Sequence, residues 1–307
     1  MNKIPIVFAF DNNLLLPACV CISSLMMNAK PDTFYDIFIL YPADEKMNLE
    51  QLTKIQTIYT NCNIQYRPVG NDFNQAFEIR GVTTPTYYRL LIPELIPEYD
   101  KIIYSDVDVI FRNDLSYIYN TTNLEDCYLA GVNSLSSLIP EFNMYYSETL
   151  HLESSDIIYA GNLIINSKQL LQDNKITAFR TLARKNYTFQ DMDIINIACH
   201  GKIKHLSPAF CLTNYINDFI VNYPDRLSDI WKEAEMADAL NHGIVHYNGQ
   251  KPWQGYCVNF DIWWEYYRKS PVFDNNFYFE FFHNKMDEYN RLPLIKRIKI
   301  LMRYFLQ

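Results

Sequence analysis

Two aspartates separated by one residue, Asp106 and Asp108, follow a short apolar run in the middle of the chain. That run, Ile102 to Tyr104, has the composition of a buried strand. Because alternate residues of an extended chain point to the same side, the two carboxylates can converge beyond the strand end. Converging anions repel each other unless a cation or protons separate them. The pattern therefore predicts a hard divalent ion with oxygen ligands, Mg²⁺ or Mn²⁺.

Three interpretations of this pair are open at this point. The aspartates can be solvated acids where a strand turns into a loop. Haloacid-dehalogenase-like phosphatases carry D-x-D-x-[TV] after a strand and use one aspartate as the nucleophile, and Asp106 to Val109 fit that pattern. Nucleotide-sugar glycosyltransferases of the GT-A type use D-x-D to hold a metal ion on a diphosphate. The rest of the chain has to distinguish these possibilities.

An alternation of strands and helices is expected to position these side chains. Apolar patterns predict strands at 4–10, 35–40, 64–67, 101–105, 128–132 and 163–166. They predict helices at 14–28, 47–59, from 86 onward, 167–185 and 191–200. This order is typical of an α/β fold with a mostly parallel sheet and helices on both faces. Ligands of such sheets bind beyond the carboxyl ends of the strands, so Asp11 and Asn13, after the first strand, are expected to line the same crevice.

The composition excludes several classes of function. The 307-residue chain has a net charge of −8, which argues against a general nucleic-acid binder. Its seven cysteines, an odd number without paired spacing, favour a reducing cytoplasm over a disulfide framework. We find neither the apolar run of a signal peptide nor a stretch of about 20 apolar residues that predicts a spanning helix. We therefore expect a cytoplasmic protein.

Four segments carry polar motifs. They are FAFDNN at 8–13, the run at 86–111 that leads into the aspartate pair, FQDMDIIN at 189–196, and HYNGQKPW at 246–253. In this order they resemble glycosyltransferase family 8, a retaining GT-A group that includes bacterial lipooligosaccharide galactosyltransferases, lipopolysaccharide glucosyltransferases and glycogenin. The last two segments resemble its D-Q-D-x-x-N motif and its H-x-x-G-x-x-K-P-W box. The resemblance spans roughly residues 4–255 and weakens the phosphatase interpretation, because no G-D-x-x-x-D motif follows the aspartate pair.

The resemblance implies a Rossmann-like GT-A domain over residues 1–255. The residues beyond it, 256–307, are expected to form an aromatic and basic amphipathic, helical C-terminal appendix. It implies a UDP-sugar donor, UDP-glucose or UDP-galactose, and a saccharide acceptor in bacterial surface-polysaccharide or lipopolysaccharide synthesis. His246 would join the two aspartates, Asp106 and Asp108, as the third metal ligand. Gly249 would let the backbone approach a phosphate closely, and Lys251 would place a positive charge on the departing diphosphate.

The resemblance also assigns residues to the nucleotide and the sugar. Asp11 and Asn13 would bind uracil and ribose, with backbone contacts from Ala9. Arg89 would reach the sugar or a phosphate, and Asp191 would accept hydrogen bonds from sugar hydroxyls. Asp193 can share that task or cap the helix that begins there. The donor site would further include Val107, Asn133, Ala160 and Gly161.

Three positions depart from the family pattern, so the donor sugar stays open. Met192 occupies a catalytic position where several relatives have a glutamine that was considered as the nucleophile, and a thioether cannot replace an amide oxygen. Tyr159 stands where the family has a sugar-contacting asparagine, and Asn133 where some relatives have aspartate. Because Met192 cannot act as the nucleophile, we favour same-face attack over double displacement, with Asp191 as the fallback nucleophile. A catalytically degenerate nucleotide-sugar-binding protein is the non-enzymatic alternative.

The C-terminal segment at 294–305 has apolar residues on one helical face and Lys296, Arg297, Lys299 and Arg303 on the other. A basic amphipathic helix in an acidic protein can lie on the anionic inner face of a membrane, near a lipid-linked acceptor. It can equally pack on the catalytic domain with a solvated basic face. The aromatic and partly polar stretch at 134–156 can form a lid or contact the acceptor.

Overall fold

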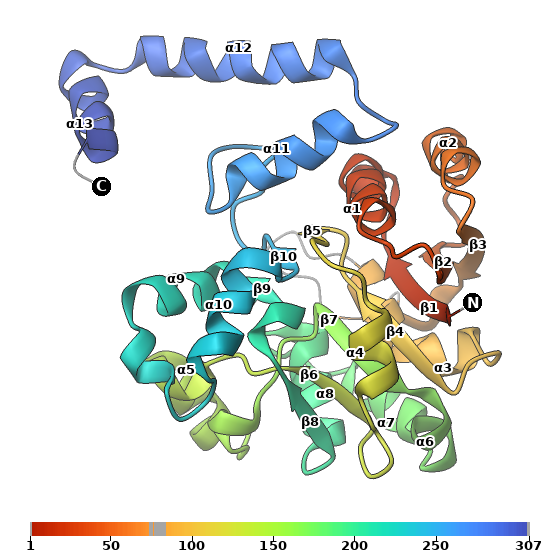
Figure 1. Cartoon of the computed structure of the whole chain (residues 1–307). Coiled ribbons are helices and arrows are strands. Elements are labelled where there is room, and N and C mark those ends of the chain that lie inside the picture. The colour runs from red at the N-terminus through yellow and green to blue at the C-terminus, as the bar shows by residue number, and fades with distance from the viewer. Residues whose placement is uncertain (1, 74–75, 77–83, 306–307) are drawn as a thin grey trace.

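The computed structural model describes residues 2–73, 76 and 84–305, and its centre is a seven-stranded sheet (Figure 1). The strand order is β3-β2-β1-β4-β7-β6-β8. The strands are β1 Asn2–Ala9, β2 Thr33–Pro42, β3 Cys62–Val69, β4 Lys101–Ser105, β6 Leu129–Val132, β7 Asn162–Asn166 and β8 Ile203–Leu206. Only β7 runs antiparallel to its neighbours in this sheet. The mostly parallel sheet that the sequence predicts is therefore confirmed.

A second, three-stranded sheet of the described chain has the order β5-β10-β9. Its strands are β5 Val109–Ile110, β10 Val245–His246 and β9 Leu212–Thr213. β10 pairs antiparallel with β5 and parallel with β9. This small sheet brings the chain that follows Asp108 beside His246, although the two residues are far apart in sequence.

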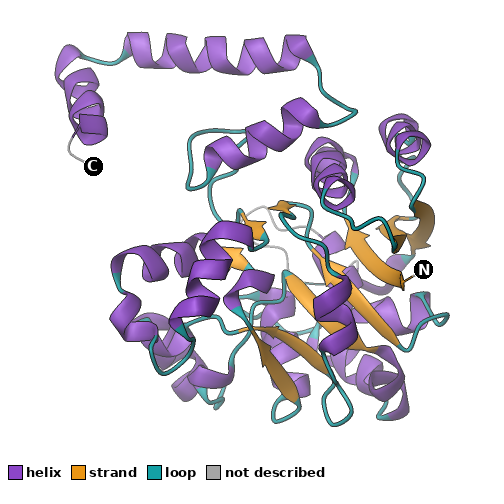
Figure 2. Ribbon diagram, viewed as in Figure 1, coloured by secondary structure: helices purple, strands orange, loops and turns teal. Residues whose placement is uncertain are grey.

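Helices cover both faces of the large sheet (Figure 2). The α-helices are α1 Leu15–Met27, α2 Glu50–Ile58, α3 Ile92–Leu95, α4 Ser116–Thr121, α5 Pro140–Met144, α6 Ser167–Gln172, α7 Lys175–Leu182, α8 Gln190–Cys199, α9 Asn214–Asn222, α10 Glu233–His242, α11 Phe260–Lys269, α12 Asn275–Arg291 and α13 Leu294–Phe305. Alternate residues of β1 enter the two separate cores: Ile6 and Phe8 pack with α1, and Val7 and Ala9 pack on the other face.

Three expected helices differ in detail from the structure. The helix expected from 86 onward is a 3₁₀-helix, Thr84–Leu91, followed by the single turn α3. The helix expected at 167–185 is two helices, because Asn174 adopts a left-handed conformation with φ 52° between α6 and α7. The helix expected at 47–59 begins later, at Glu50.

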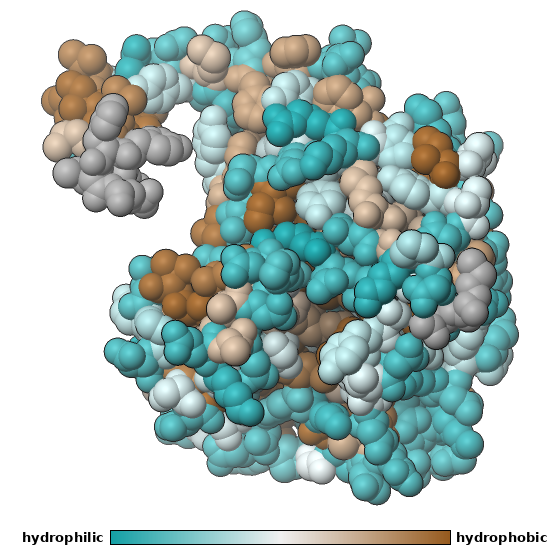
Figure 3. All heavy atoms as spheres, viewed as in Figure 1, coloured by the Kyte–Doolittle hydropathy of each residue, from teal (hydrophilic) through white to brown (hydrophobic). Residues whose placement is uncertain are grey.

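The C-terminal helices attach to the body through aromatic contacts. α11 buries Trp263, Trp264 and Tyr267, whereas no residue of α12 is buried. α13 stands away from the body, and in Figure 3 its apolar residues form a brown patch at the upper left. Within the described ranges, no helix has the length and apolar character needed to cross a membrane. The expected domain boundary at residue 255 stays a prediction.

Candidate metal and donor site

Asp106, Asp108 and His246 converge at the carboxyl end of β4. Asp106 directly follows β4, Asp108 precedes β5, and His246 is the second residue of β10. One ligand atom from each side chain lies within 4.8 Å of the others. His246 Nε2 is 3.6 Å from Asp106 Oδ2 and 3.3 Å from Asp108 Oδ1. The structure therefore brings together the three side chains that are expected to bind the metal.

Gly161 leaves the space that these three side chains need. It lies directly before β7, and its carbonyl accepts a hydrogen bond from Asp106 N at 2.7 Å. A Cβ atom on Gly161 would overlap the His246 ring and lie 2.8 Å from Asp106 Oδ2. Two carboxylates and an imidazole that meet over a glycine fit a hard divalent ion such as Mg²⁺ or Mn²⁺.

Two positive groups balance the charge of Asp108. Lys251 forms an ion pair with it and also donates a hydrogen bond to Tyr247 O at 2.5 Å. Burial raises the pKa of Asp108, but Lys251 and His246 outweigh burial and hold that pKa well below its usual value. Burial lowers the pKa of His246, but Asp108 outweighs burial and raises it well above its usual value. The proton of His246 and the ammonium group of Lys251 together carry the charge of one divalent cation. Such an ion can therefore take the place of that proton and that ammonium group beside Asp108, with the neutral imidazole as a ligand.

The buried side chain of Arg89 orients one ligand and connects it to Asp191. Its Nη2 donates to Asp106 Oδ1 at 2.8 Å, and its Nη1 donates to Ala160 O at 2.6 Å. Its Nε lies 3.1 Å from Asp191 Oδ2. Tyr104 OH also donates to Asp106 Oδ1, at 2.7 Å. These bonds hold Oδ1, which leaves Oδ2 of Asp106 facing His246.

Asp191 lies in the first turn of α8, close to Asp106 but not among the three converging ligands. Its Oδ1 accepts a hydrogen bond from Thr86 Oγ1 at 3.1 Å. Burial raises the pKa of Asp191 to about 6, although Arg89 opposes the rise. The next residue, Met192, is partly buried against the apolar core on that face of the sheet.

Asp193 is fully buried and serves as a cap, which is one of the roles left open by the sequence. Its Oδ2 accepts hydrogen bonds from Phe189 N at 2.9 Å and from Tyr145 OH at 2.7 Å. Its Oδ1 accepts one from Tyr146 OH at 3.0 Å. The carboxylate thus binds the start of α8 to the π-helical turn Tyr145–Thr149 in the 134–156 stretch.

The predicted nucleotide residues lie at the same edge of the sheet, because β1 and β4 are parallel neighbours. Asp11 is buried, and its carboxylate accepts hydrogen bonds from Asn13 N at 2.9 Å and Asn13 Nδ2 at 3.3 Å. Asn13 itself is exposed, whereas Ala9 and Val107 are buried. The placement agrees with a shared crevice, and the contacts of these residues with a nucleotide stay predictions.

The side chain of Asn133 forms hydrogen bonds to the backbone at both ends of the 134–156 stretch. Its amide donates to Ser155 O at 2.5 Å and accepts from Leu135 N at 2.7 Å. The amide therefore joins the two ends of the 134–156 stretch, which contains short helical turns rather than a single helix. A role of that stretch as lid or acceptor contact stays a prediction.

The phosphate-binding residues expected in HYNGQKPW are arranged around a tight loop. Asn248 Oδ1 accepts a hydrogen bond from Asn214 N at 3.0 Å. A Cβ atom on Gly249 would lie 3.2 Å from Asn214 Nδ2, so the loop packs closely on the start of α9. Lys251 contacts Asp108 from this loop, which places its ammonium group beside the three converging side chains.

Sequence reasoning missed two neighbours of the cluster. Cys211 is buried, and its Sγ lies 3.4 Å from His246 Nδ1, opposite the nitrogen that faces the aspartates. A single cysteine in an apolar stretch gives no sequence signal for this contact. Tyr104 stands two residues before Asp106 on the same side of the strand, so strand periodicity could have identified it.

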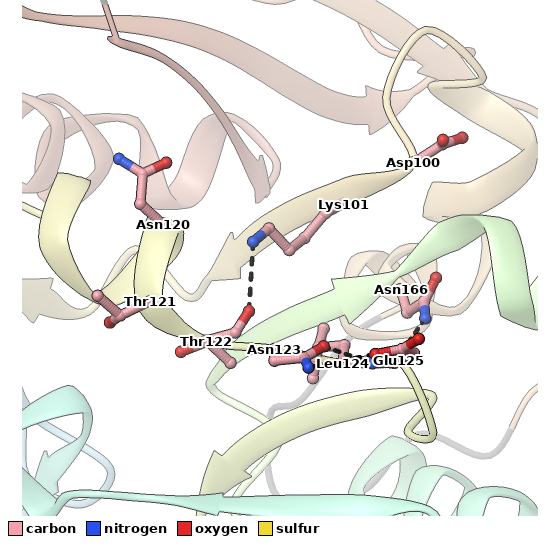
Figure 4. A pocket seen from close by; sticks show the side chains of 9 residues that line it. All are labelled: Asp100, Lys101, Asn120, Thr121, Thr122, Asn123, Leu124, Glu125 and Asn166. Atoms are coloured by element: carbon pink, nitrogen blue, oxygen red, sulfur yellow. Dashed lines mark hydrogen bonds between the residues drawn. The ribbon is translucent and has the colours of Figure 1, made fainter.

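A polar cavity elsewhere in the molecule contains none of the predicted site residues (Figure 4). It lies at the amino end of β4 and is lined by Asp100, Lys101, Asn120, Thr121, Thr122, Asn123, Leu124, Glu125 and Asn166. Lys101 Nζ donates to Tyr119 O at 2.7 Å, and Asn166 Nδ2 donates to Leu124 O at 2.9 Å. These bonds connect β4 to α4 and β7 to the loop that follows α4, so we do not assign the cavity a ligand.

Comparison with known proteins gives one family over most of the chain. The model of glycosyl transferase family 8 matches residues 5–257. A putative glycosyltransferase of Haemophilus influenzae is 29% identical over 223 residues, which cover 70% of this chain and 65% of that protein. The human glycosyltransferase 8 domain-containing protein 2 is 22% identical over 216 residues, 61% of this chain and 58% of that protein. The chain thus spans less than two thirds of the length of these curated relatives.

Solved structures share the fold. The bifunctional glycosyltransferase WbbM superimposes with a TM-score of 0.71 at 21% identity, over 90% of this chain and 51% of that one. The galactosyltransferase LgtC, solved with donor and acceptor sugar analogs, superimposes with a TM-score of 0.70 at 23% identity, over 89% of this chain and 98% of that one. At these identities the likeness establishes a GT-A-like α/β architecture.

Proposed function

The chain belongs to glycosyltransferase family 8, and from this premise we propose that it is a metal-dependent, retaining glycosyltransferase. It would move glucose or galactose from UDP-glucose or UDP-galactose to a saccharide acceptor. The observation that supports the proposal most is the convergence of Asp106, Asp108 and His246 where β4 ends. A bound Mn²⁺ or Mg²⁺ ion would act there as a Lewis acid on the leaving diphosphate.

Lys251 and Gly249 would act on the diphosphate. Lys251 already lies at the cluster, and a cation beside Asp108 would release its ammonium group for a phosphate oxygen. The backbone at Gly249 would approach the phosphate without a side chain in between. At the other end of the donor, Asp11 and Asn13 would bind uracil and ribose.

Same-face attack is the proposed route to retention of configuration. The acceptor hydroxyl would attack the anomeric carbon as the bond to phosphate breaks, and the leaving phosphate oxygen would take the hydroxyl proton. Met192 cannot supply an amide oxygen as a nucleophile, and both oxygens of Asp191 are held by Thr86 and Arg89. Asp191 is still the alternative nucleophile, because it is the carboxylate next to Met192 and Arg89 connects it to Asp106.

A catalytically degenerate nucleotide-sugar-binding protein is the competing function, and Met192 and Tyr159 are the observations in its favour. The phosphatase alternative has no support from the family match. The three functions differ in what they release. A binding protein releases nothing, a phosphatase releases inorganic phosphate from a phosphate ester, and a transferase releases UDP when an acceptor is present.

Release of UDP from a panel of sugar nucleotides tests the proposal. The panel comprises UDP-glucose, UDP-galactose and their N-acetyl forms, each with Mn²⁺ and with a saccharide acceptor or water. We expect UDP release from one donor, its loss in Asp108→Asn, and retention of the anomeric configuration in the product. Stabilisation by UDP with Mn²⁺ but no release from any donor would instead support the binding protein.

We also propose a setting in bacterial surface-polysaccharide synthesis, with a lipid-linked acceptor. The support is α13, whose apolar side chains are exposed, for example 71% for Leu294 and 69% for Ile295. Its other face carries Lys296, Arg297 and Lys299, whereas the side chains of Arg303 and Phe305 lie outside the described part. Such a helix can lie on an anionic lipid surface. Co-sedimentation with phosphatidylglycerol vesicles but not phosphatidylcholine vesicles, lost in Ile295→Asp, is the expected result, and equal sedimentation with both would contradict it.

A further inference from the structure

Arg112 lies on the chain segment that carries the two aspartates and reaches across to another element. It follows β5 closely, and its guanidinium group contacts the end of α10. Nε donates to Gly243 O at 2.7 Å, Nη1 to Leu240 O at 2.9 Å and Nη2 to Ala239 O at 2.8 Å. Each nitrogen of the fork therefore binds a different carbonyl.

The end of α10 is a site that needs such a donor. The last carbonyls of a helix lack most of their partners within the helix, and the helix dipole makes that end negative. Of the three carbonyls bound here, that of Ala239 also accepts a hydrogen bond from Gly243 N at 3.0 Å. A guanidinium group meets three carbonyls at once because its donors are planar and diverge, which the ammonium group of a lysine cannot reproduce. Gly243 is also tightly packed, since a Cβ atom there would lie 2.6 Å from Ala239 O. The end of α10 is thus held at a fixed distance from β5.

The next element after α10 is β10, the strand that carries His246. Val245 pairs with Ile110 and His246 pairs with Val109 in the antiparallel register, and both strands have only two residues. Beyond this pairing, Tyr247 N donates to Asp108 O at 2.9 Å. A one-residue slip of a strand turns its side chains to the opposite face. On its other side β10 pairs with β9, which also has only two residues. With both pairings this short, a contact that fixes the end of α10 would further keep His246 on the side of the aspartates.

We propose that Arg112 is a positioning residue for the metal site. By binding the end of α10 it sets the register of β10 against β5, and this register places His246 Nε2 beside Asp106 and Asp108. The inference rests on the proposed function, since it concerns affinity for the same cation. It adds a residue whose hydrogen bonds go to the end of α10 and to none of the three expected ligands.

The affinity of the full chain for Mn²⁺ alone, measured by calorimetry, tests this role. Loss of a residue that orients a ligand typically lowers metal affinity about 10- to 100-fold. We expect a loss in this range for Arg112→Met and a smaller loss for Arg112→Lys. The matched control is Arg180→Met, because Arg180 also donates three hydrogen bonds, to Asp72 and Glu94, on the surface. The control should leave the affinity unchanged.

A second background separates positioning from general destabilisation. If Arg112 acts through His246, Arg112→Met should have little further effect on Mn²⁺ affinity in a His246→Ala protein. In the metal-free protein the amide of Tyr247 should exchange its hydrogen faster in both Arg112 variants than in the wild type. Arg112→Lys keeps a donor and serves both measurements should the methionine variant not fold.

The outcomes separate this inference from the proposed function. A wild-type protein that does not bind Mn²⁺ contradicts the metal site itself. Wild-type binding with unchanged affinity in both Arg112 variants overturns only the positioning role. An equal loss of affinity with and without His246, or an unchanged exchange rate at Tyr247, would also overturn it.

Discussion

The metal site and the C-terminal helices are held together in opposite ways. The site consists of polar side chains from distant parts of the chain, and Arg89 alone connects Asp106, Asp191 and the carbonyl of Ala160. By contrast, α12 attaches through rings: Trp264 of α11 contacts four aromatic side chains of α12, at 277, 278, 281 and 282. No residue of α12 is buried.

This difference teaches which changes each region tolerates. Buried hydrogen-bonded charges demand defined geometry, because an unmet partner in a low-dielectric interior is costly. Aromatic contacts depend mainly on the area removed from water and accept small shifts. We therefore expect the change of a single polar atom to disrupt the site. In the C-terminal helices we expect the loss of a whole ring to weaken the packing.

The largest expected effect is that of Asp108→Asn on transfer. The substitution keeps the shape of the side chain but removes the charge that faces His246 and Lys251. Loss of one group that stabilises developing charge commonly lowers kcat about 100- to 1,000-fold. Steady-state UDP release measures this. Asp100→Asn, on an exposed side chain at the far end of β4, is the control and should retain full activity. Equal activity of both variants would exclude Asp108 from the site.

Trp264→Ala should have the next largest effect, on stability rather than on metal affinity. Replacement of a buried tryptophan by alanine typically lowers the free energy of unfolding by about 3–5 kcal/mol, and we expect the lower end of that range because α12 is only partly covered. Denaturant titration measures the loss. Phe279→Ala, which removes an exposed ring of α12, should change stability by less than about 0.5 kcal/mol. A drop in Mn²⁺ affinity in the Trp264 variant would show that the two regions are coupled.

Gly161→Ala tests whether the site depends on the space that the missing side chain of Gly161 leaves for His246 and Asp106. The added methyl group would displace the His246 ring, so we expect an affinity for Mn²⁺ about 10- to 100-fold lower. Gly70→Ala is a matched control, because among the described residues no atom beyond its chain neighbours lies within 4 Å of a Cβ atom at that position. Calorimetry on both variants makes the comparison. Unchanged affinity in Gly161→Ala would mean that His246 does not need its observed position.

The smallest expected effect comes from Asp114, a buried carboxylate away from the site. It accepts hydrogen bonds from Lys30 N at 3.0 Å, Tyr35 OH at 3.1 Å and Ser116 N at 2.9 Å. Burial raises the pKa of Asp114, but the hydrogen bonds from Ser116 and Lys30 outweigh burial and lower it. A carboxylate whose pKa is lowered by folding stabilises the folded state at pH values above its pKa in the unfolded chain, which is about 3.9. This stability is lost as the pH falls through its lower pKa in the folded protein.

We therefore expect Asp114→Asn to be less stable than the wild type by about 1 kcal/mol at pH 7. The difference should shrink as the pH falls below about 4. Denaturant titrations at several pH values measure it. A difference that is independent of pH would show that the charge of Asp114 contributes nothing.

Much of the fold could be predicted because it depends on local patterns. Apolar runs identify β1, β2 and β4. The two aspartates, however, converge across a bend between β4 and β5 rather than along one extended strand. The break at Asn174 was not foreseeable, since a left-handed asparagine leaves the apolar periodicity on both sides intact.

The site could be predicted only as far as its residues lie in motifs. Asp106, Asp108 and His246 belong to such motifs, and the structure brings them together. The contacts of Cys211 and Arg112 could not be predicted, because both depend on how two-residue strands and a helix end meet in three dimensions. Likewise, only the folded chain shows that the donors of the Arg89 guanidinium group already bind protein groups, namely Asp106, Asp191 and the carbonyl of Ala160.

Anomalous diffraction at the manganese edge, from crystals grown with Mn²⁺ and UDP, tests the central claim most directly. We expect one strong peak bonded to Asp106, Asp108 and His246, with the UDP diphosphate as a further ligand and Lys251 moved from Asp108 toward a phosphate. A peak bound elsewhere, or a nucleotide bound while these three side chains point apart, would contradict the proposed metal site and the function built on it.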